Sequence, residues 1–239
     1  MLFGLINLLL SDSSAFFKAL PLVLLTIVLS LLVAITIHEF GHAAVANLLG
    51  DRTARNMGRV SLNPLKHLDP VGTLFLVLVG FGWGKPVPVN PYALKKARRD
   101  MALVALAGPA ANIILALVVG FALRGGEFRW FLIQPFFSID ALSVTGLISL
   151  MLSTMVYYNI LLGLFNLIPI APLDGSKVLI GLLPETEAEA VARIEPYGPA
   201  IIMVIFMFDV LRSGPGIFGT ILRPFIQFFV WISTGVKPF

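Results

Sequence analysis

The amino-acid sequence predicts an α-helical polytopic membrane protein with about six membrane segments. Of its 239 residues, 58% are hydrophobic and only 13% are charged, whereas a soluble domain carries about 25% charged residues. The mean hydropathy is +0.94. Residues 19–37 contain no charged side chain, and a crossing of the hydrocarbon core needs about 20 such residues. These observations favour several membrane-spanning helices over a soluble fold.

The first long helix is expected from Ala15 to Leu49, with Gly50 as its C-cap. At about 1.5 Å per residue, residues 20–37 cover about 27 Å, which is most of the hydrocarbon thickness. His38 is therefore expected toward the far end of this crossing. Residues 1–10 are apolar but too short to span, so we expect them to lie at the membrane interface or to pair with another chain.

Residues 51–100 are expected to form a cytosolic, membrane-associated segment. Its nine basic residues are Arg52, Arg55, Arg59, Lys66, Lys85, Lys95, Lys96, Arg98 and Arg99, against three acidic ones. Because such an excess marks cytosolic loops, the net charge of +4 is attributed to membrane topology rather than to nucleic-acid binding. The glycine-rich run Val71–Gly84 is expected to be re-entrant. Residues 53–62 and 86–89 are expected to be short strands of a small β element.

Further helices are expected along the rest of the chain. The predicted crossings are Met101–Leu123, Ala141–Ile168 and, with weaker patterns, Gly198–Leu211 and Ile217–Ser233. Between them, Asp174–Leu183 is expected to be a short helix and residues 185–195 an acidic interfacial or cytosolic helix. Residues 1–239 are expected to form a single domain, with core motifs at 30–185 and C-terminal helices at 186–239.

The residues that carry chemistry begin with His38-Glu39-Phe40-Gly41-His42. Histidines at i and i+4 lie on one face of a helix and can bind one metal ion, and the glutamate beside that face can act as a general base. Ionisable side chains in a membrane helix are costly unless they have a function. The pattern therefore predicts a zinc hydrolase in the membrane, with His38 and His42 as ligands and Glu39 as base.

A catalytic zinc site needs a third protein ligand and an open position. The sequence has no cysteine and only three histidines, and His67 is interpreted as an interfacial or solvated histidine. A carboxylate is therefore expected. Asp174, in Pro172-Leu173-Asp174-Gly175, is the first candidate, because the expected topology brings it to the depth of His38. Asp209 is the competitor, although the topology places it near the other side of the membrane.

Three motifs together resemble the site-2 protease family of intramembrane zinc metalloproteases, peptidase family M50. They are the sequence His38–His42, the stretch Gly108-Pro109-Ala110-Ala111-Asn112, and the stretch from Asn166 to Gly175, NLIPIAPLDG. The segment Gly82–Pro91 and the tripeptide Leu62-Asn63-Pro64 also resemble bacterial and archaeal members, of the short type without a PDZ or CBS domain. The resemblance covers about residues 30–185 in the family's order.

The resemblance implies an α-helical membrane core and one zinc ion per chain, bound by His38, His42 and Asp174. It implies that Glu39 activates a water molecule and then gives a proton to the leaving amine. Asn112 and Asn166 match family asparagines near the site, which suggests substrate positioning or oxyanion support. The alternative for both asparagines is a hydrogen bond between helices. Residues 53–62 and 82–91 match β elements that can pair with an unwound substrate strand.

The predicted function is therefore an intramembrane zinc endopeptidase that cuts within or near transmembrane segments of membrane-anchored regulatory proteins. It is expected to be a multi-pass protein of the cytoplasmic membrane, with its active site toward the cytosol. Its expected partners are a transmembrane protein substrate and the lipid bilayer, with no nucleic acid, and its oligomeric state is open. The alternatives are a catalytically inactive membrane scaffold or an ion transporter that uses the same polar residues. A transport site has no need of a base at Glu39.

Overall fold

The fold was taken from a computed structural model of the chain. It describes residues 13–72, 84–126, 128, 130, 143–211, 214 and 216–236. The expectation for residues 1–10 lies outside the described residues, as does most of the expected re-entrant run Val71–Gly84.

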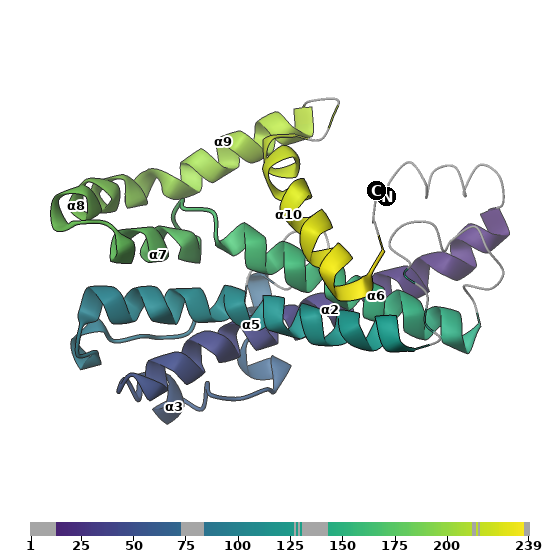
Figure 1. Ribbon diagram of the computed structural model, residues 1–239, viewed down its shortest axis with the longest axis horizontal. Helices are drawn as coiled ribbons and strands as arrows, with labels where there is room; N and C mark the ends of the chain where they lie inside the picture. The colour runs from purple at the N-terminus through teal and green to yellow at the C-terminus, as the bar shows by residue number, and fades with distance from the viewer. Residues whose placement is uncertain are drawn as a thin grey trace. The chain divides into compact units, whose positions relative to one another are not determined.

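Helices dominate the described part of the chain (Figure 1). The long helices are α2 (Ser13–Leu48), α5 (Ala97–Gly125), α6 (Val144–Asn166), α9 (Gly198–Leu211) and α10 (Ile217–Thr234). The shorter α-helices are α3 (Thr53–Asn56), α7 (Asp174–Leu182) and α8 (Glu185–Ile194). Three 3-10 turns complete the list: η1 (Pro64–Lys66), η2 (Pro91–Ala93) and η5 (Glu195–Tyr197).

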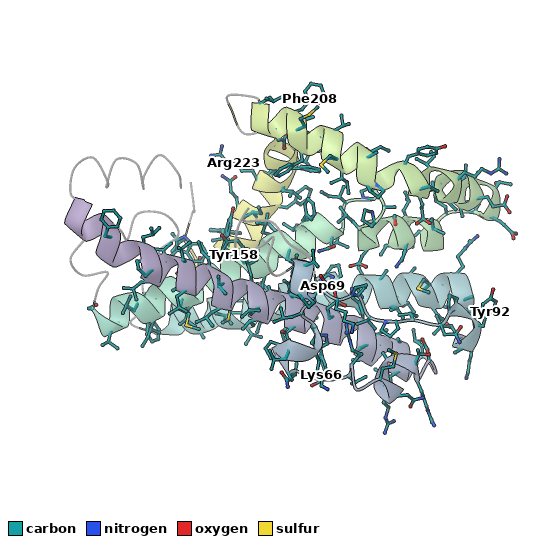
Figure 2. The ribbon with its side chains drawn as sticks, turned by 180° about the vertical axis from the view of Figure 1, so that it is seen from behind. Lys66, Asp69, Tyr92, Tyr158, Phe208 and Arg223 are labelled. Atoms are coloured by element: carbon teal, nitrogen blue, oxygen red, sulfur yellow. The ribbon has the colours of Figure 1, made fainter. Side chains whose placement is uncertain are left out.

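Among the described residues, five helical stretches are long and apolar enough to cross a membrane: Leu20–Leu48, Ala97–Gly125, Val144–Asn166, Glu185–Asp209 and Ile217–Thr234. They confirm the predicted helical membrane class, while a sixth segment is not among them. Large apolar side chains are exposed along α9, including Met203, Phe206 and Phe208, and Figure 2 shows Phe208 on that helix. Such a surface suits contact with lipid rather than water.

The end of α2 follows the predicted cap. The helix ends at Leu48, and Gly50 has φ +111°, a conformation that only glycine adopts readily. The N–H of Asp51 then donates to the carbonyl of Ala46 at 3.0 Å. The cap therefore turns the chain sharply out of α2 and into the basic segment.

The strand predicted at residues 53–62 is wrong at its start, because Thr53–Asn56 is a helical turn. The carboxylate of Asp51 accepts hydrogen bonds from the N–H and the hydroxyl of Thr53, and this local capping favours a turn over an extended chain. Among the described residues there is no sheet, and the one β-bridge that stands alone joins Leu68 and Gly84 in antiparallel sense. The small β element and the re-entrant segment are therefore not confirmed.

The chain divides into two compact units, and α2, α5, α6 and α10 each contribute to both. One unit is Met1–Ala34, Ile114–Ile160 and Gln227–Phe239, and its core includes the fully buried Val156, Ile160 and Val230. The other is Ile35–Ile113 and Leu161–Ile226. All three sequence motifs lie in this second unit, which we call the motif unit.

Candidate metal centre

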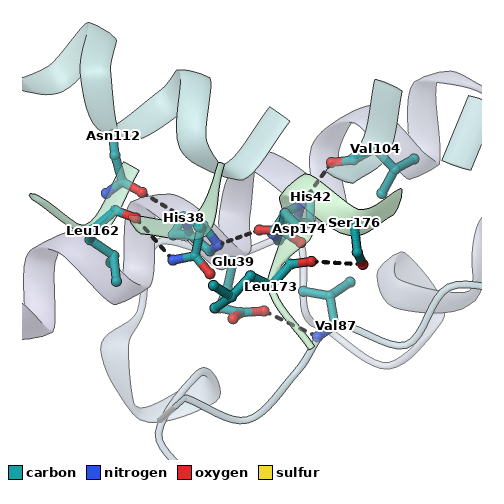
Figure 3. A network of polar contacts seen from close by, with 11 residues as sticks. His38, Glu39, His42, Val87, Val104, Asn112, Leu162, Leu173, Asp174 and Ser176 are labelled. Carbon is teal, nitrogen blue, oxygen red and sulfur yellow. Dashed lines mark hydrogen bonds and ion pairs between the residues drawn. The ribbon is translucent and has the colours of Figure 1, made fainter. Parts of the chain in front are cut away.

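Three potential metal ligands come together in the motif unit (Figure 3). His38 and His42 lie one turn apart on α2, with ring centroids 4.6 Å apart. Their Nε2 atoms lie 3.0 and 3.2 Å from Oδ2 of Asp174, the first residue of α7. One ligand atom from each residue lies within 4.8 Å of the others. The structure thus brings together the two predicted histidines and the predicted carboxylate.

Asp174 reaches the histidines because the chain folds back tightly after α6. Gly175 packs against the end of α6, where a Cβ atom would collide with the carbonyl oxygens of Leu167 and Ile168. Only glycine allows α7 to begin this close to the preceding turn. The glycine of the Leu-Asp-Gly motif therefore positions the aspartate that precedes it.

The hydrogen bonds of the histidines decide whether the site suits a cation. His42 Nδ1 lies 2.7 Å from the carbonyl oxygen of Val104, which can only accept, so Nδ1 carries the ring proton. In neutral His42, Nε2 is then a lone pair that faces a carboxylate oxygen at 3.2 Å. Two acceptors at this distance repel unless a proton or a metal cation lies between them. Two imidazole nitrogens and a carboxylate are a suitable donor set for a catalytic zinc ion.

The pKa of Asp174 is consistent with an ionised ligand. Burial raises the pKa of this carboxyl, but hydrogen bonds and charge interactions with His38 and His42, made when these rings carry a proton on Nε2, outweigh burial and hold the pKa well below its usual range. Positive charge at this position therefore favours the carboxylate form of Asp174, which is the form that binds a metal.

Glu39 lies beside the three ligands and is half-buried. Its Oε2 accepts a hydrogen bond of 3.1 Å from the backbone N–H of Val87 (Figure 3). Gly84, directly before the extended segment 85–90, also lies beside Glu39, since a Cβ there would be 3.6 Å from Oε1. The base candidate is thus held by a backbone segment rather than by another side chain.

A cavity of about 190 Å³ adjoins the ligands and Glu39. Its other lining residues are Pro86, Val87, Val89, Met101, Val104, Ala105, Asn166, Pro172 and Lys177. Asn166 is therefore at the cavity, where its Nδ2 donates to the carbonyl of Leu162. Asn112 is not among the lining residues; its Oδ1 lies 2.7 Å from Nδ1 of His38, and it is fully buried.

The competing ligand candidates have other roles. Asp209 caps the start of α10, where its two carboxylate oxygens accept from the N–H groups of Ile217 and Phe218 at 2.5 and 3.0 Å. His67 was expected to be interfacial or solvated, which is wrong, because it is fully buried. Its Nε2 lies 2.7 Å from the carbonyl oxygen of Ser61, which links two parts of the basic segment.

The sequence did not reveal the backbone groups of the site. The carbonyl of Val104 and the N–H of Val87 touch His42 and Glu39, but neither valine carries a side chain that suggests such a role. A glycine in the second motif is a better indication that α5 packs closely against the histidines. Gly108 stands in the second motif, and a Cβ there would overlap the ring of His42 and lie 2.9 Å from Cε1 of His38.

Comparison with known proteins identifies the family. The model of peptidase family M50 matches residues 26–208, which include all three motifs. No solved structure matches the chain significantly.

Three curated relatives are similar over most of the chain. "Putative zinc metalloprotease YwhC" of Bacillus subtilis is 39% identical over 183 residues, which are 76% of this chain and 80% of the relative. "Putative zinc metalloprotease Rip2" of Mycobacterium tuberculosis is 32% identical over 76% of this chain and 66% of its own length. The protein of the same name from Mycolicibacterium smegmatis is 30% identical over 80% of this chain and 70% of its own length. With these matches and the ligand geometry, the chain belongs to peptidase family M50, the site-2 protease family.

Proposed function

We propose that this protein is an intramembrane zinc endopeptidase that hydrolyses peptide bonds within or near transmembrane segments of membrane-anchored proteins. The observation that carries the proposal is the convergence of His38, His42 and Asp174 at a cavity that Glu39 also lines. The five apolar helical stretches of the described chain support a membrane setting. The family and the relatives' names support zinc as the metal.

The proposed roles follow from the chemistry of each residue. His38, His42 and Asp174 would hold one zinc ion, which when bound acts as a Lewis acid and lowers the pKa of a bound water toward about 7. Glu39 takes a proton from the attacking water onto its carboxylate and passes it to the leaving amine. The N–H of Val87 keeps this carboxylate at the cavity. Asn166 lines the same cavity and is proposed to position the substrate or to support the oxyanion.

The extended segment 85–90 is proposed to bind the substrate backbone. A transmembrane helix hides its peptide bonds in internal hydrogen bonds, so cleavage requires local unwinding and new backbone partners. Pro86, Val87 and Val89 line the cavity. Pro86 and Pro88 lack an N–H, and the N–H of Val87 already donates to Glu39. The N–H of Val89 is therefore the donor of this cavity-lining stretch that we propose for the substrate backbone. An unwound substrate strand could pair along this edge beside the site.

The cytosolic side of the cytoplasmic membrane is the proposed location of the active site. The basic residues of segment 51–100 are almost all exposed, and Figure 2 shows Lys66 extending away from the ribbon. Two carboxylates of the segment are buried and accept hydrogen bonds from backbone groups: Asp51 from Asn90 N–H, and Asp100 from Lys96 N–H. The exposed positive charge of the segment supports a cytosolic location, because basic loops are typical of the cytosolic side.

The test combines metal analysis with cleavage by the purified protein in liposomes. Wild type should hold about one zinc ion per chain and cut a model transmembrane substrate. Glu39→Gln should keep the zinc and lose about 10²–10⁴-fold in cleavage rate, because a carboxamide cannot accept the proton. Asp174→Ala should lower the zinc content. The matched control is Glu189→Gln, which changes an exposed glutamate on α8.

Each outcome assigns a role. If Glu39→Gln cuts as fast as wild type, Glu39 is not the base. If Asp174→Ala retains stoichiometric zinc, another residue is the third ligand. A wild-type protein that holds zinc but cuts no transmembrane substrate would contradict the proposed substrate class.

A further inference from the structure

We propose that Asn112 is a positioning residue for the metal site, which fixes His38 in the tautomer that binds zinc, rather than a residue that touches the substrate. The inference rests on the proposed function only in taking zinc as the metal. Oδ1 of Asn112 accepts a hydrogen bond of 2.7 Å from Nδ1 of His38, and both side chains are buried. Figure 3 shows the amide directed at this ring.

A tautomer matters here because His38 can use only one ring nitrogen for the metal. Nε2 is the atom that faces Asp174, at 3.0 Å. A proton on Nδ1, held by the Asn112 carbonyl, leaves Nε2 as a lone pair. The opposite orientation of the amide would donate Nδ2–H to Nδ1 and put the ring proton on Nε2, where it would block the ligand position. The acceptor atom of Asn112 therefore selects the form of His38 that binds a cation.

Asn112 belongs to a stripe along α5 that serves both histidines. Residues 104, 108 and 112 recur every four residues on one helix face. Val104 accepts from His42 through its carbonyl, and Asn112 accepts from His38 through its side chain. Between them stands Gly108, where a Cβ would overlap the ring of His42. The acceptor for His42 is a backbone carbonyl, which any residue at position 104 would provide. The acceptor for His38 is a side-chain oxygen, so residue 112 must be one that carries such an oxygen, as asparagine does.

Close packing of α2 on α5 brings these acceptors within reach. A Cβ at Gly41, between the two histidines, would be 2.6 Å from the carbonyl oxygen of Ala107 and 3.1 Å from Cβ of Ala111. Gly41 and Gly108 thus let the two backbones approach closely enough for side-chain and carbonyl acceptors on α5 to meet both rings. Asn112 is fully buried in this contact and is absent from the cavity lining. From that position Asn112 contacts His38 rather than the cavity where a peptide would bind, so we infer that it acts on the metal site through His38.

The experiment measures zinc affinity rather than cleavage. The purified protein is titrated with zinc against a chelator of known affinity, and cleavage kinetics are recorded separately. Asn112→Leu removes the acceptor at similar volume and should weaken zinc binding by about 10–100-fold. Asn112→Asp keeps an acceptor and should keep zinc affinity within about threefold of wild type. Asn159→Leu is the control, since Asn159 is also fully buried and donates to Met155 within α6. It should leave zinc affinity unchanged.

Three results would overturn the inference: unchanged zinc affinity in Asn112→Leu, a raised KM with normal zinc affinity, or equal loss of zinc in Asn112→Leu and Asn112→Asp. If Asn112→Leu does not purify as a folded protein, Asn112→Ala replaces it under the same expectations. The proposed function fails separately. If wild type cuts no transmembrane substrate while Asn112→Leu still loses zinc affinity, the positioning role stands without the proposed substrate.

Discussion

The proposed metal ligands and the proposed base of this site are held by two different kinds of structure. His38 and His42 stand on α2 and are held by acceptors on α5, so regular helices in close contact fix both rings. Glu39 stands on the same helix, yet its carboxylate is held by the N–H of Val87, in an extended segment. Among the described residues, the β-type pairing of this segment is limited to its start, where Gly84 bridges Leu68 and Lys85 N–H donates to His67. The turn of α2 from His38 to His42 therefore contacts helix α5 through its two histidines and the extended segment 85–90 through Glu39.

This difference suits the two tasks. A metal site needs ligands fixed closely in position, and packed helices provide that. A peptide bond must enter beside the base, and an extended segment has backbone groups that can pair with it. The segment is nevertheless tied down: Arg59 donates to the carbonyls of Lys85 and Pro86, and Asp51 accepts from Asn90 N–H. Substitutions in the helical support should therefore affect zinc, whereas substitutions in the ties should affect cleavage and leave zinc in place.

Among substitutions in the two supports, the largest effect is expected from Gly108→Ala, in the helical support. The added Cβ would overlap the ring of His42 and crowd His38, so α2 and α5 must separate or the rings must turn. We expect zinc affinity to fall by about 100-fold, with a parallel loss of cleavage. Gly125→Ala, at the other end of α5, is the matched control, because a Cβ there meets nothing within 4 Å. Normal zinc affinity in Gly108→Ala would mean that the close helix contact does not support the metal site.

A smaller effect is expected from Arg59→Met, in the ties of the extended segment. Arg59 is buried, and its Nη2 donates to two successive carbonyls, those of Lys85 and Pro86. Without these bonds the segment should hold Val87 less firmly at Glu39, and we expect kcat/KM to fall about tenfold, a change of about 1.4 kcal/mol. Zinc content should stay at the wild-type level. Arg55→Met changes an exposed arginine of the same segment and should change neither quantity. Loss of zinc in Arg59→Met would show that the two supports are not separate.

The same division explains what could be predicted from the sequence. The spacing of His38 and His42 defines one helix face, and the long apolar runs around them predict membrane helices, so these elements follow from local pattern. Asp174 was predicted from the lack of other ligands, from the expected topology and from the motif resemblance, and the fold brings it to the histidines. The role of Val87 and the helical turn at Thr53–Asn56 were missed. Both depend on hydrogen bonds to single carboxylates, those of Glu39 and Asp51, which no residue pattern reveals.

The smallest effect on cleavage is expected from the second tie, Asp51, whose effect on stability should depend on pH. Burial raises the pKa of this carboxyl, but hydrogen bonds from the hydroxyl and N–H of Thr53 and from the N–H of Asn90 outweigh burial and lower the pKa below its usual value. A lowered pKa in the folded state means that Asp51 stabilises the fold above its unfolded pKa of about 3.9 and that this stabilisation is lost as pH falls toward the folded pKa.

Asp51→Asn should therefore destabilise the protein at pH 7 by about 1.5 to 3 kcal/mol, since the amide can accept at only one atom. Thermal unfolding in detergent should show this gap at pH 7 and a smaller gap as pH falls below about 4. Cleavage at pH 7 and low temperature should change less than in Arg59→Met, because Arg59 still holds Lys85 and Pro86 next to Val87. A stability gap that is the same at pH 7 and below pH 4 would contradict the role of the ionised carboxylate. Arg59 would then be the residue that positions the extended segment 85–90 beside Glu39.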